Sequence, residues 1–252
     1  MDVKGHAAIV TGGGSGLGAE AARHLARAGA KVTALDLNGE AAEAVAGEIG
    51  GLGLACDVAS AAEAEAAVAK ARDAHGPCRV LVNCAGIAPA KRIVGRDGQM
   101  PLEFFENVIK INLIGSFNLL RLTAADMLGN DPINDDGERG VVISTASIAA
   151  VEGQLGQVAY AASKAGINGM MLPAAREFAK NGVRVLTIAP GLIGTPLLLN
   201  MPQEVQDNLA GQVPFPHRFG HPGEFAALVL HICENTMLNA DTIRLDGAMR
   251  MQ

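Results

Sequence analysis

The segment AYAASKAG, residues 159–166, holds two side chains whose types and spacing could move a proton. Tyr160 is the only tyrosine in 252 residues, and Lys164 follows it by four positions. On a helix, residues i and i+4 share one face, so the phenol and the ammonium would be neighbours. A nearby positive charge lowers the pKa of a phenol from about 10, because it stabilises the phenolate. Tyr160 could therefore serve as a general base on an alcohol or as a general acid on a ketone.

Ser147 stands thirteen residues before Tyr160, at the end of the apolar run GVVISTAS. Its hydroxyl could hydrogen-bond the same substrate oxygen as the phenol and fix the position of that oxygen. The alternative is a surface helix that happens to carry a tyrosine and a lysine. Because a strand end, the serine, the tyrosine and the lysine fall within 18 residues, we favour a reacting centre in which Ser147 and Tyr160 also contact the substrate.

A glycine-rich segment, TGGGSGLG at residues 11–18, lies between an apolar run and a helical pattern. A glycine motif alone is weak evidence, since many tight turns need glycine for a positive φ. Between a strand and a helix, however, the helix N-terminus would direct N–H groups and a positive dipole end at a pyrophosphate. The residues expected to bind a dinucleotide here are Gly12, Ser15, Gly16, Leu17 and Gly18.

The rest of the chain alternates continuous apolar runs with helical patterns. Strands are expected at residues 7–12, 31–37, 53–58, 79–86, 140–147, 183–191 and 242–247, and helices at 16–30, 39–50, 61–76, 102–128 and 158–180. Continuous apolar strands between helices indicate a parallel sheet covered on both faces. The expected fold is α/β, a single doubly wound Rossmann domain whose seven-stranded parallel sheet has the order 3-2-1-4-5-6-7, with helices on both faces.

We expect one domain over residues 1–252, with a nucleotide-binding part at about 1–140 and a catalytic and substrate part at about 141–252. Residues 195–222 are apolar and interrupted by prolines, which suggests a mobile flap over an apolar ligand. Its large apolar residues, Leu197, Leu198, Leu199, Met201, Val213 and Phe215, could form the wall of an acyl site or equally a packing interface.

Two further segments, 87–100 and 129–140, carry glycine, proline and charge without helical period. We expect the second to be a solvated surface loop. The first follows the carboxyl end of a strand, where open α/β sheets bind ligands, so it could border the site. Its cations Lys91, Arg92 and Arg96 could meet phosphates at the rim or simply be solvated.

Asp36 ends the second expected strand, where a carboxylate could accept from both hydroxyls of an adenosine ribose. The alternative is that Asp36 caps the helix that follows. No lysine or arginine occurs between Val32 and Ala69, so a 2′-phosphate would meet a negative charge and no cation. The cofactor expected is therefore NAD. The residues expected beside its adenine and ribose are Asp57, Val58, Asn83, Cys84, Ala85 and Gly86.

The composition and the residue spacing limit the binding partners, the compartment and the metals that we expect for this protein. A net charge of −6 argues against nucleic acid. Four cysteines without a C-x-x-C pair indicate reduced thiols and a cytoplasmic protein. No apolar run approaches the ~18 residues that span a bilayer. His217 and His221 are four residues apart, but glycine and proline interrupt the segment and no third ligand is evident, so no metal is expected.

Taken together, the glycine turn, NCAG, the serine, Y-x-x-x-K and PG resemble a full-length member of the short-chain dehydrogenase/reductase family, whose hallmark is TG-x-x-x-G-x-G. The resemblance implies that Lys164 also holds the nicotinamide ribose and that Asn112 kinks its helix and anchors a water in a proton relay. It also implies that Pro190, Gly191, Ile193 and Thr195 bind the nicotinamide end, with Thr195 on the carboxamide. The family's usual second asparagine in N-N-A-G is Cys84 here, which we expect to pack rather than to do redox chemistry.

Within that family, SIAAVEGQLGQVAYAASKAGINGM, TIAPGLIGTPLL, QVPFPHRFG and IRLDGAMRMQ resemble the subgroup of type II 3-hydroxyacyl-CoA dehydrogenases, which is also described as 17β-hydroxysteroid dehydrogenase. The resemblance implies NAD-dependent oxidation of L-3-hydroxyacyl-CoA to 3-ketoacyl-CoA in fatty acid metabolism, a homotetramer, and a substrate contact at Gln154. The alternatives are another NAD-linked secondary-alcohol or hydroxysteroid dehydrogenase, and a non-catalytic NAD-binding scaffold.

Overall fold

The computed structural model describes residues 1–251 of the chain, except the side chain of Leu197. Its centre is a sheet of seven strands in the order β3-β2-β1-β4-β7-β8-β9, with every neighbouring pair parallel. The strands are β1 (Ala7–Thr11), β2 (Lys31–Asp36), β3 (Leu52–Ala55), β4 (Cys78–Asn83), β7 (Gly140–Thr145), β8 (Val183–Pro190) and β9 (Thr242–Leu245). The predicted doubly wound sheet and its strand order are confirmed.

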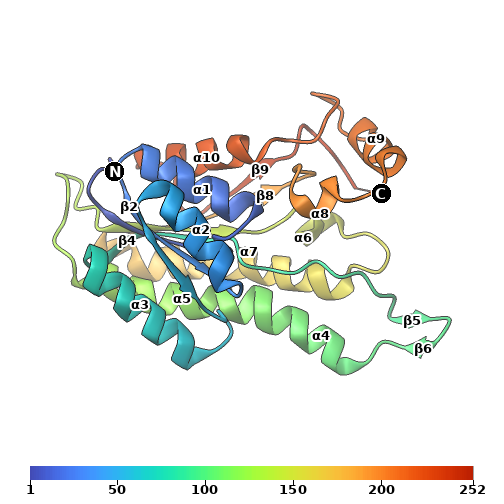
Figure 1. Ribbon diagram of the computed structural model, residues 1–252, viewed down its shortest axis with the longest axis horizontal. Coiled ribbons are helices and arrows are strands. Elements are labelled where there is room, and N and C mark those ends of the chain that lie inside the picture. Colours follow the sequence, from blue (N-terminus) through green and yellow to red (C-terminus); the bar gives the residue numbers. More distant parts are fainter. Residues whose placement is uncertain (252) are drawn as a thin grey trace.

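Helices cover both faces of the sheet (Figure 1). One face carries α1 (Gly16–Arg27), α2 (Gly39–Ile49) and α10 (Pro222–Glu234), and the other carries α3 (Ala61–His75), α5 (Gly115–Gly129) and α7 (Val158–Phe178). Successive residues of a strand feed opposite layers: Val10 packs with the first set and Ile9 with the second. This explains the continuous apolar runs, because neither side of a strand faces water.

The helix α10 was missed in the sequence. It packs along α1, and its side chains Phe225, Val229 and Ile232 are completely buried beneath it. Pro222 begins the helix and Glu224 closes a capping box with His221, which is a start signal that sequence alone carries. The start signal was therefore present in the sequence, but no helix was expected between the irregular segment 195–222 and the strand at 242–247.

The expected helix over 102–128 is three pieces in one continuous rod. α4 (Leu102–Ile109) leads into a π-helical turn at Lys110–Ile114, and α5 continues from it. By length and composition alone Leu102–Gly129 could cross a membrane, but half of its most apolar window is buried inside the protein. Its apolar character is explained by contact with β4 and β7.

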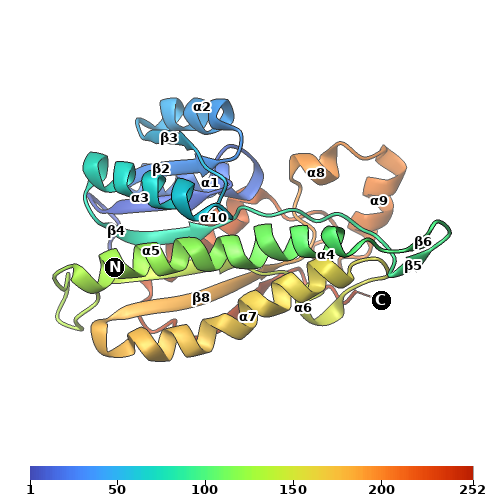
Figure 2. The ribbon, with the colours of Figure 1, turned by 90° about the horizontal axis from the view of Figure 1, so that it is seen from below.

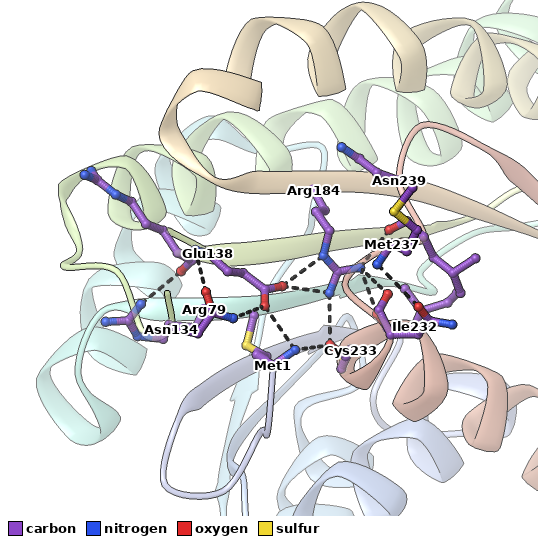
Figure 3. A network of polar contacts seen from close by, with 12 residues as sticks. Met1, Arg79, Asn134, Glu138, Arg184, Ile232, Cys233, Met237 and Asn239 are labelled. Carbon is purple, nitrogen blue, oxygen red and sulfur yellow. Dashed lines mark hydrogen bonds and ion pairs between the residues drawn. The ribbon is translucent and has the colours of Figure 1, made fainter. Parts of the chain in front are cut away.

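The segment 129–140 is not simply a solvated loop, as the sequence had suggested. Glu138 is only 4% exposed, and its carboxylate pairs with Arg184 at 2.8 Å and with the amino group of Met1 at 3.1 Å (Figure 3). Arg184 also donates to the carbonyls of Ile232, Cys233 and Leu238 at the end of α10. A buried charge needs such partners because it has lost its water.

The remaining short elements gather at the carboxyl end of the sheet. They are the exposed hairpin of β5 (Val94–Gly95) and β6 (Gly98–Gln99), α6 (Ala149–Glu152), α8 (Pro196–Leu199) and α9 (Gln203–Gly211). Figures 1 and 2 place α6, α8, α9 and the C-terminus at the same end of the molecule. The segment 195–222 thus contains two short helices instead of being irregular throughout.

The buried ion pair at the opposite end of the sheet predicts a stability effect. Arg184→Met should lower the free energy of unfolding by about 3–5 kcal/mol, because it leaves the Glu138 carboxylate and several carbonyls of α10 without their donor. Urea denaturation measures this loss. The control is Arg23→Met, which removes a more exposed ion pair of 2.7 Å with Glu48 and should cost about 1 kcal/mol or less. Equal losses in the two variants would contradict the account.

Candidate active site

The glycine turn after β1 is built for close approach. Gly12 has φ +63, and a Cβ there would lie 2.9 Å from the backbone nitrogen of Ala85; a Cβ at Gly18 would overlap the carbonyl of Gly12. The helix α1 begins at Gly16. Ser15 precedes it in extended conformation, and its side chain makes no capping hydrogen bond. Glycine at these two positions therefore lets the turn pack directly against neighbouring backbone. The backbone donors at the start of α1 carry no side-chain cap from Ser15, and such a helix N-terminus fits a dinucleotide pyrophosphate.

Asp36 closes one side of this turn. Its Oδ2 accepts from the backbone N–H of Gly14 at 3.0 Å, and its Oδ1 accepts from the N–H of Asn38 at 3.0 Å. The residue that caps α2 is Asn38, whose side chain accepts from Ala41. The capping alternative for Asp36 is therefore wrong, and the carboxylate lies beside the glycine turn, as a ribose-binding role requires.

The ends of β3 and β4 form the next part of the site. Asp57 accepts from the N–H of Ala59 at 2.9 Å and begins the loop into α3, while Val58 is buried beneath the glycine at 115. Asn83 is also buried: its side chain donates to the backbone of Ser116 and to Ser144. Its amide thus joins β4 to α5 and β7, so the side chain has a structural role inside the protein.

Thr11 is a site residue that the sequence analysis did not single out. Its hydroxyl accepts from the N–H groups of Cys84 and Ala85, both at 3.1 Å. The strand end that carries the glycine turn is thereby joined to the strand end that carries NCAG. The only sequence signal was the threonine before Gly12, at the end of the first strand.

The structure brings the three predicted reacting residues together. Tyr160, in the first turn of α7, makes a side-chain hydrogen bond with Ser147, which follows β7. Lys164 Nζ lies 5.7 Å from the centroid of the Tyr160 ring. The residue Lys164 is only 5% exposed, and its ammonium donates to the carbonyl oxygen of Thr145 at 2.6 Å. Serine, phenol and ammonium therefore form one cluster at the carboxyl edge of the sheet.

The pKa of the Tyr160 phenol differs from the expectation drawn from sequence. Burial raises the pKa of Tyr160, and the hydrogen bond with Ser147 offsets this only in part. The sequence suggested a lowered value through Lys164, but that ammonium is committed to the Thr145 carbonyl. Burial in turn lowers the pKa of Lys164 to about 8. Withdrawal from water thus disfavours both charged forms, the phenolate and the ammonium.

Asn112 lies in the π-helical turn and is completely buried. Its Oδ1 accepts from the N–H of Ile87 at 2.8 Å, and its Nδ2 donates to the Ile87 carbonyl at 2.9 Å. The same Nδ2 donates to Ser163 Oγ at 3.0 Å, and Ser163 Oγ donates to the Tyr160 carbonyl at 2.7 Å. The helix irregularity at Asn112 agrees with the kink expected from the family, and Ser163, which sequence reasoning missed, extends the contact to Tyr160.

Because Gly86 has no side chain, the side chains of Asn112 and Lys164 can lie close to its backbone. A Cβ at this position would lie 3.0 Å from Asn112 Oδ1 and 3.7 Å from Lys164 Nζ. Cys84, two residues earlier, receives a hydrogen bond from Thr145 Oγ1 at 3.4 Å. Burial raises the pKa of the Cys84 thiol to about 11, so the group stays neutral beside Lys164, in keeping with a packing role.

The end of β8 lies across from the glycine turn. Pro190 is its last residue, and Gly191 donates its N–H to Leu245 on β9. Ile193 is buried and forms a bridge with Gly220. Thr195 precedes α8 in extended conformation, and a Cβ at Gly16 would lie 3.5 Å from its Cγ2. The predicted nicotinamide contacts and the predicted pyrophosphate turn therefore face each other.

The expected substrate side is more varied than an apolar wall. Gln154 is exposed, in the turn between α6 and α7. In the flap, Phe215 is 79% exposed and Leu199 52% exposed, whereas Val213 is buried with Ile148 and Met249. The side chain of Leu197 lies outside the described residues. Only part of the flap thus has apolar surface to offer a ligand.

Residues 1–251 contain no cluster of three His, Cys, Asp or Glu side chains suited to a metal ion. His221 serves as the N-cap of α10, and His217 Nδ1 lies 2.8 Å from the Val213 carbonyl. Both histidines have local structural contacts.

The buried ammonium predicts a pH-dependent stability. The pKa of Lys164 is about 8 in the folded protein against about 10.4 in the unfolded chain, so the unfolded chain binds this proton more tightly. The cost of the charge is full below pH ~8 and fades between about 8 and 10.4. Lys164→Met should therefore be more stable than the native protein by up to about 3 kcal/mol at pH ~7, with a smaller gap at pH ~9.5. Urea unfolding at both pH values measures the gap, and a gap that does not change would refute the burial cost.

Comparison with known proteins places this geometry in a family. Residues 6–206 match the family model of short chain dehydrogenases. The chain is 51% identical over 257 residues to 3-hydroxyacyl-CoA dehydrogenase type-2 of Bos taurus, covering 99% of this chain and 97% of that protein. It is 46% identical to the protein of the same name from Drosophila melanogaster, covering 99% of each.

A solved structure agrees with the fold. The crystal structure of 3-hydroxyacyl-CoA dehydrogenase type-2 from Mycobacterium avium superposes with a TM-score of 0.94 at 40% identity, over 98% of this chain and 97% of that one. The expected family resemblance is thus confirmed over nearly the full length of the chain. The chain belongs to the short-chain dehydrogenase family, whose dehydrogenases are oxidoreductases that use a nicotinamide cofactor.

Proposed function

We propose that the protein catalyses the reversible, NAD-dependent oxidation of the 3-hydroxyl of L-3-hydroxyacyl-CoA to the 3-keto thioester. The proposal is supported by about 50% identity, over nearly the full length, to proteins named 3-hydroxyacyl-CoA dehydrogenase type-2. The observation that carries the chemistry is the cluster of Ser147, Tyr160 and Lys164 at the carboxyl edge of the sheet.

In this mechanism Tyr160 takes the hydroxyl proton of the substrate during oxidation and returns it during reduction. Ser147, already hydrogen-bonded to the phenol, holds the reacting oxygen in place. The nicotinamide, when bound, accepts or returns the hydride. Lys164 supplies positive charge beside the phenol and would hold the cofactor ribose. Asn112 and Ser163 fix the first turn of α7 through the Tyr160 carbonyl.

The glycine turn and the N-terminus of α1 suit the pyrophosphate of either nicotinamide dinucleotide. We propose NAD because Asp36 places a carboxylate beside that turn, bonded to the N–H of Gly14. A 2′-phosphate there would meet like charge, and no cation lies between Val32 and Ala69 to offset it.

A thioester with a long polar head and an apolar tail suits the rim of the site. Lys91, Arg92 and Arg96 are exposed around the β5–β6 hairpin and could meet the phosphates of CoA. Leu155, Leu199 and Phe215 are exposed apolar side chains at the same end of the molecule. These exposed groups support an acyl-CoA over a small polar alcohol.

We also propose that the protein is a homotetramer in the cytoplasm. The outer face of α4 and α5 carries Leu102, Ile114 and Phe117, each at least 49% exposed. A cavity of about 470 Å³ lies on this face, lined by Phe105, Ile109 and Ile114 among others. An apolar surface of this kind favours contact between copies of the chain, and sedimentation equilibrium would determine the number of copies.

The first test of the proposed reaction is Tyr160→Phe. It should lower turnover of acetoacetyl-CoA with NADH at least about 10³-fold, because the general acid is gone. NADH binding, followed by its fluorescence, should stay within about threefold, because the ring remains in place. Equal turnover by the variant would remove the phenol from the mechanism. A native protein that binds NADH and turns over neither thioesters nor alcohols would favour the scaffold alternative.

A substrate panel separates the dehydrogenase alternatives. The native protein should oxidise L-3-hydroxybutyryl-CoA more efficiently than the D isomer, 17β-hydroxysteroids or small secondary alcohols, as measured by kcat/KM from NADH absorbance. A steroid preferred over every thioester would establish the hydroxysteroid alternative instead.

The cofactor preference is tested at Asp36. Asp36→Ala removes the carboxylate that would hold a ribose diol and repel a 2′-phosphate, so the ratio of kcat/KM for NAD over NADP should fall by about 10- to 100-fold. Asp57→Ala, a carboxylate at the end of the neighbouring strand, serves as control and should change this ratio by less than about threefold. Equal use of both cofactors by the native protein would contradict the proposed role of Asp36.

A further inference from the structure

The short helix α6 and the turn after it connect Ser147 to the helix that carries Tyr160. They follow Ser147 directly and lead into Tyr160, and the turn contains Gln154. The turn is closed by two hydrogen bonds between Gln154 and Gln157. Its outer side chains, Val151 and Leu155, are 74% and 75% exposed, so little of the turn is held by core packing.

Besides its packing against α7, α6 is held by an ionic contact with the C-terminal segment of the chain. Glu152, the last residue of α6, accepts from Arg244 of β9 through both oxygens, at 2.9 and 3.1 Å. The same carboxylate accepts from the N–H of Met251 at 3.2 Å and lies 3.5 Å from Arg250 Nε. A bidentate guanidinium–carboxylate pair with an added N–H donor fixes both position and orientation.

Residues 246–251, here called the C-terminal strap, are themselves organised by Arg244. Arg244 pairs with Asp246 at 2.6 Å and donates to the Met249 carbonyl at 2.9 Å. Asp246 is nearly buried and also accepts from the N–H of Ala248. One guanidinium thus binds the strap and α6 at the same time.

The strap also reaches the two neighbouring parts of the site. Met249 is buried against Ile148, which follows Ser147, and against Val213 of the flap. Gly247 accepts from the N–H of Phe215, and it has no room for a side chain because a Cβ would lie 2.5 Å from Val213. On its other side the turn after α6 is bonded through the Gly156 carbonyl to the N–H of Lys91.

We propose that Arg244 and Glu152 are positioning residues that hold the 153–157 turn, and with it Gln154, in the conformation that binds the acyl substrate. This inference rests on the proposed function, in which Gln154 contacts the substrate. Neither residue touches the reacting atoms. Their effect is on the shape of the substrate side, because the glycine turn and the adenosine side of the site are built from β1, β2 and β4. The strap meets the predicted nicotinamide end where Asp246 packs against Gly191.

The test compares Arg244→Gln with Arg23→Gln. The control removes an ion pair between α1 and α2, 2.7 Å long, whose arginine is exposed to a similar degree as Arg244. In Arg244→Gln the KM for acetoacetyl-CoA should rise at least about fivefold, with kcat and NADH affinity changed by less than about twofold. Arg244→Lys retains the charge but cannot make the bidentate contact, so its KM should fall between the native and the Arg244→Gln values. Arg23→Gln should leave all three quantities unchanged.

Hydrogen exchange supplies a readout that does not depend on the substrate. Amides of residues 148–157 should exchange faster in Arg244→Gln and in Glu152→Ala, but not in Arg23→Gln. The double variant should exchange no faster than either single one, because the two residues act through one contact. Unchanged exchange in this segment overturns the proposal, as does an unchanged KM in a folded Arg244→Gln protein.

The two proposals can fail separately. If the native protein turns over no acyl-CoA, the proposed substrate is wrong, and the KM comparison is made with the alcohol of highest turnover in the panel. If kcat and NADH affinity fall together with KM in Arg244→Gln, the pair supports the whole fold and the positioning role is overturned.

Discussion

The reacting end depends on one feature that costs folding free energy: a lysine ammonium is buried at the carboxyl edge of the sheet. Lys164 can be placed there because its ammonium donates a hydrogen bond to the Thr145 carbonyl at 2.6 Å and because Gly86 leaves space beside it. Cys84 stays neutral next to it. Such a group costs stability until a ligand or a phenolate uses its charge, which is the usual relation between an active site and the fold that supports it.

The amino end of the sheet carries structural contacts, and the carboxyl end carries the site residues. At the amino end, Glu138 and Arg184 join the long connection before β7 to the C-terminus of α10 and take no part in chemistry. At the carboxyl end, strand ends carry the glycine turn, NCAG and Ser147. Parallel strands bring all their carboxyl ends to one edge, so residues distant in sequence converge there without long loops.

Much of this could be predicted from sequence, for identifiable reasons. The seven strands are continuous apolar runs, and the turn 11–18, Ser147, Tyr160 and Lys164 stand in spacings that short-range geometry constrains. Asp36 could be placed at a strand end but not distinguished from a helix cap until Asn38 was seen to be the cap.

The features that escaped prediction depend on contacts between distant segments. Glu138 looked solvated because the partner that buries it, Arg184, lies 46 residues away. The pKa of Tyr160 was expected to fall, because spacing reveals a neighbouring cation but neither the loss of water nor the carbonyl that occupies that cation. Ser163 and Thr11 offered only a residue type, whose value appears once Asn112 and the NCAG backbone are in place.

The hydroxyl of Thr11 has a wider consequence. By accepting from two successive amides just after β4, it joins the glycine turn to the segment that carries Gly86, which lies beside Asn112 and Lys164. The Asp36 carboxylate bonds to Gly14 of the same turn. The residues that select the cofactor and those that carry the chemistry are thus joined through one threonine hydroxyl, and a redesign of the first must keep that hydroxyl to leave the second undisturbed.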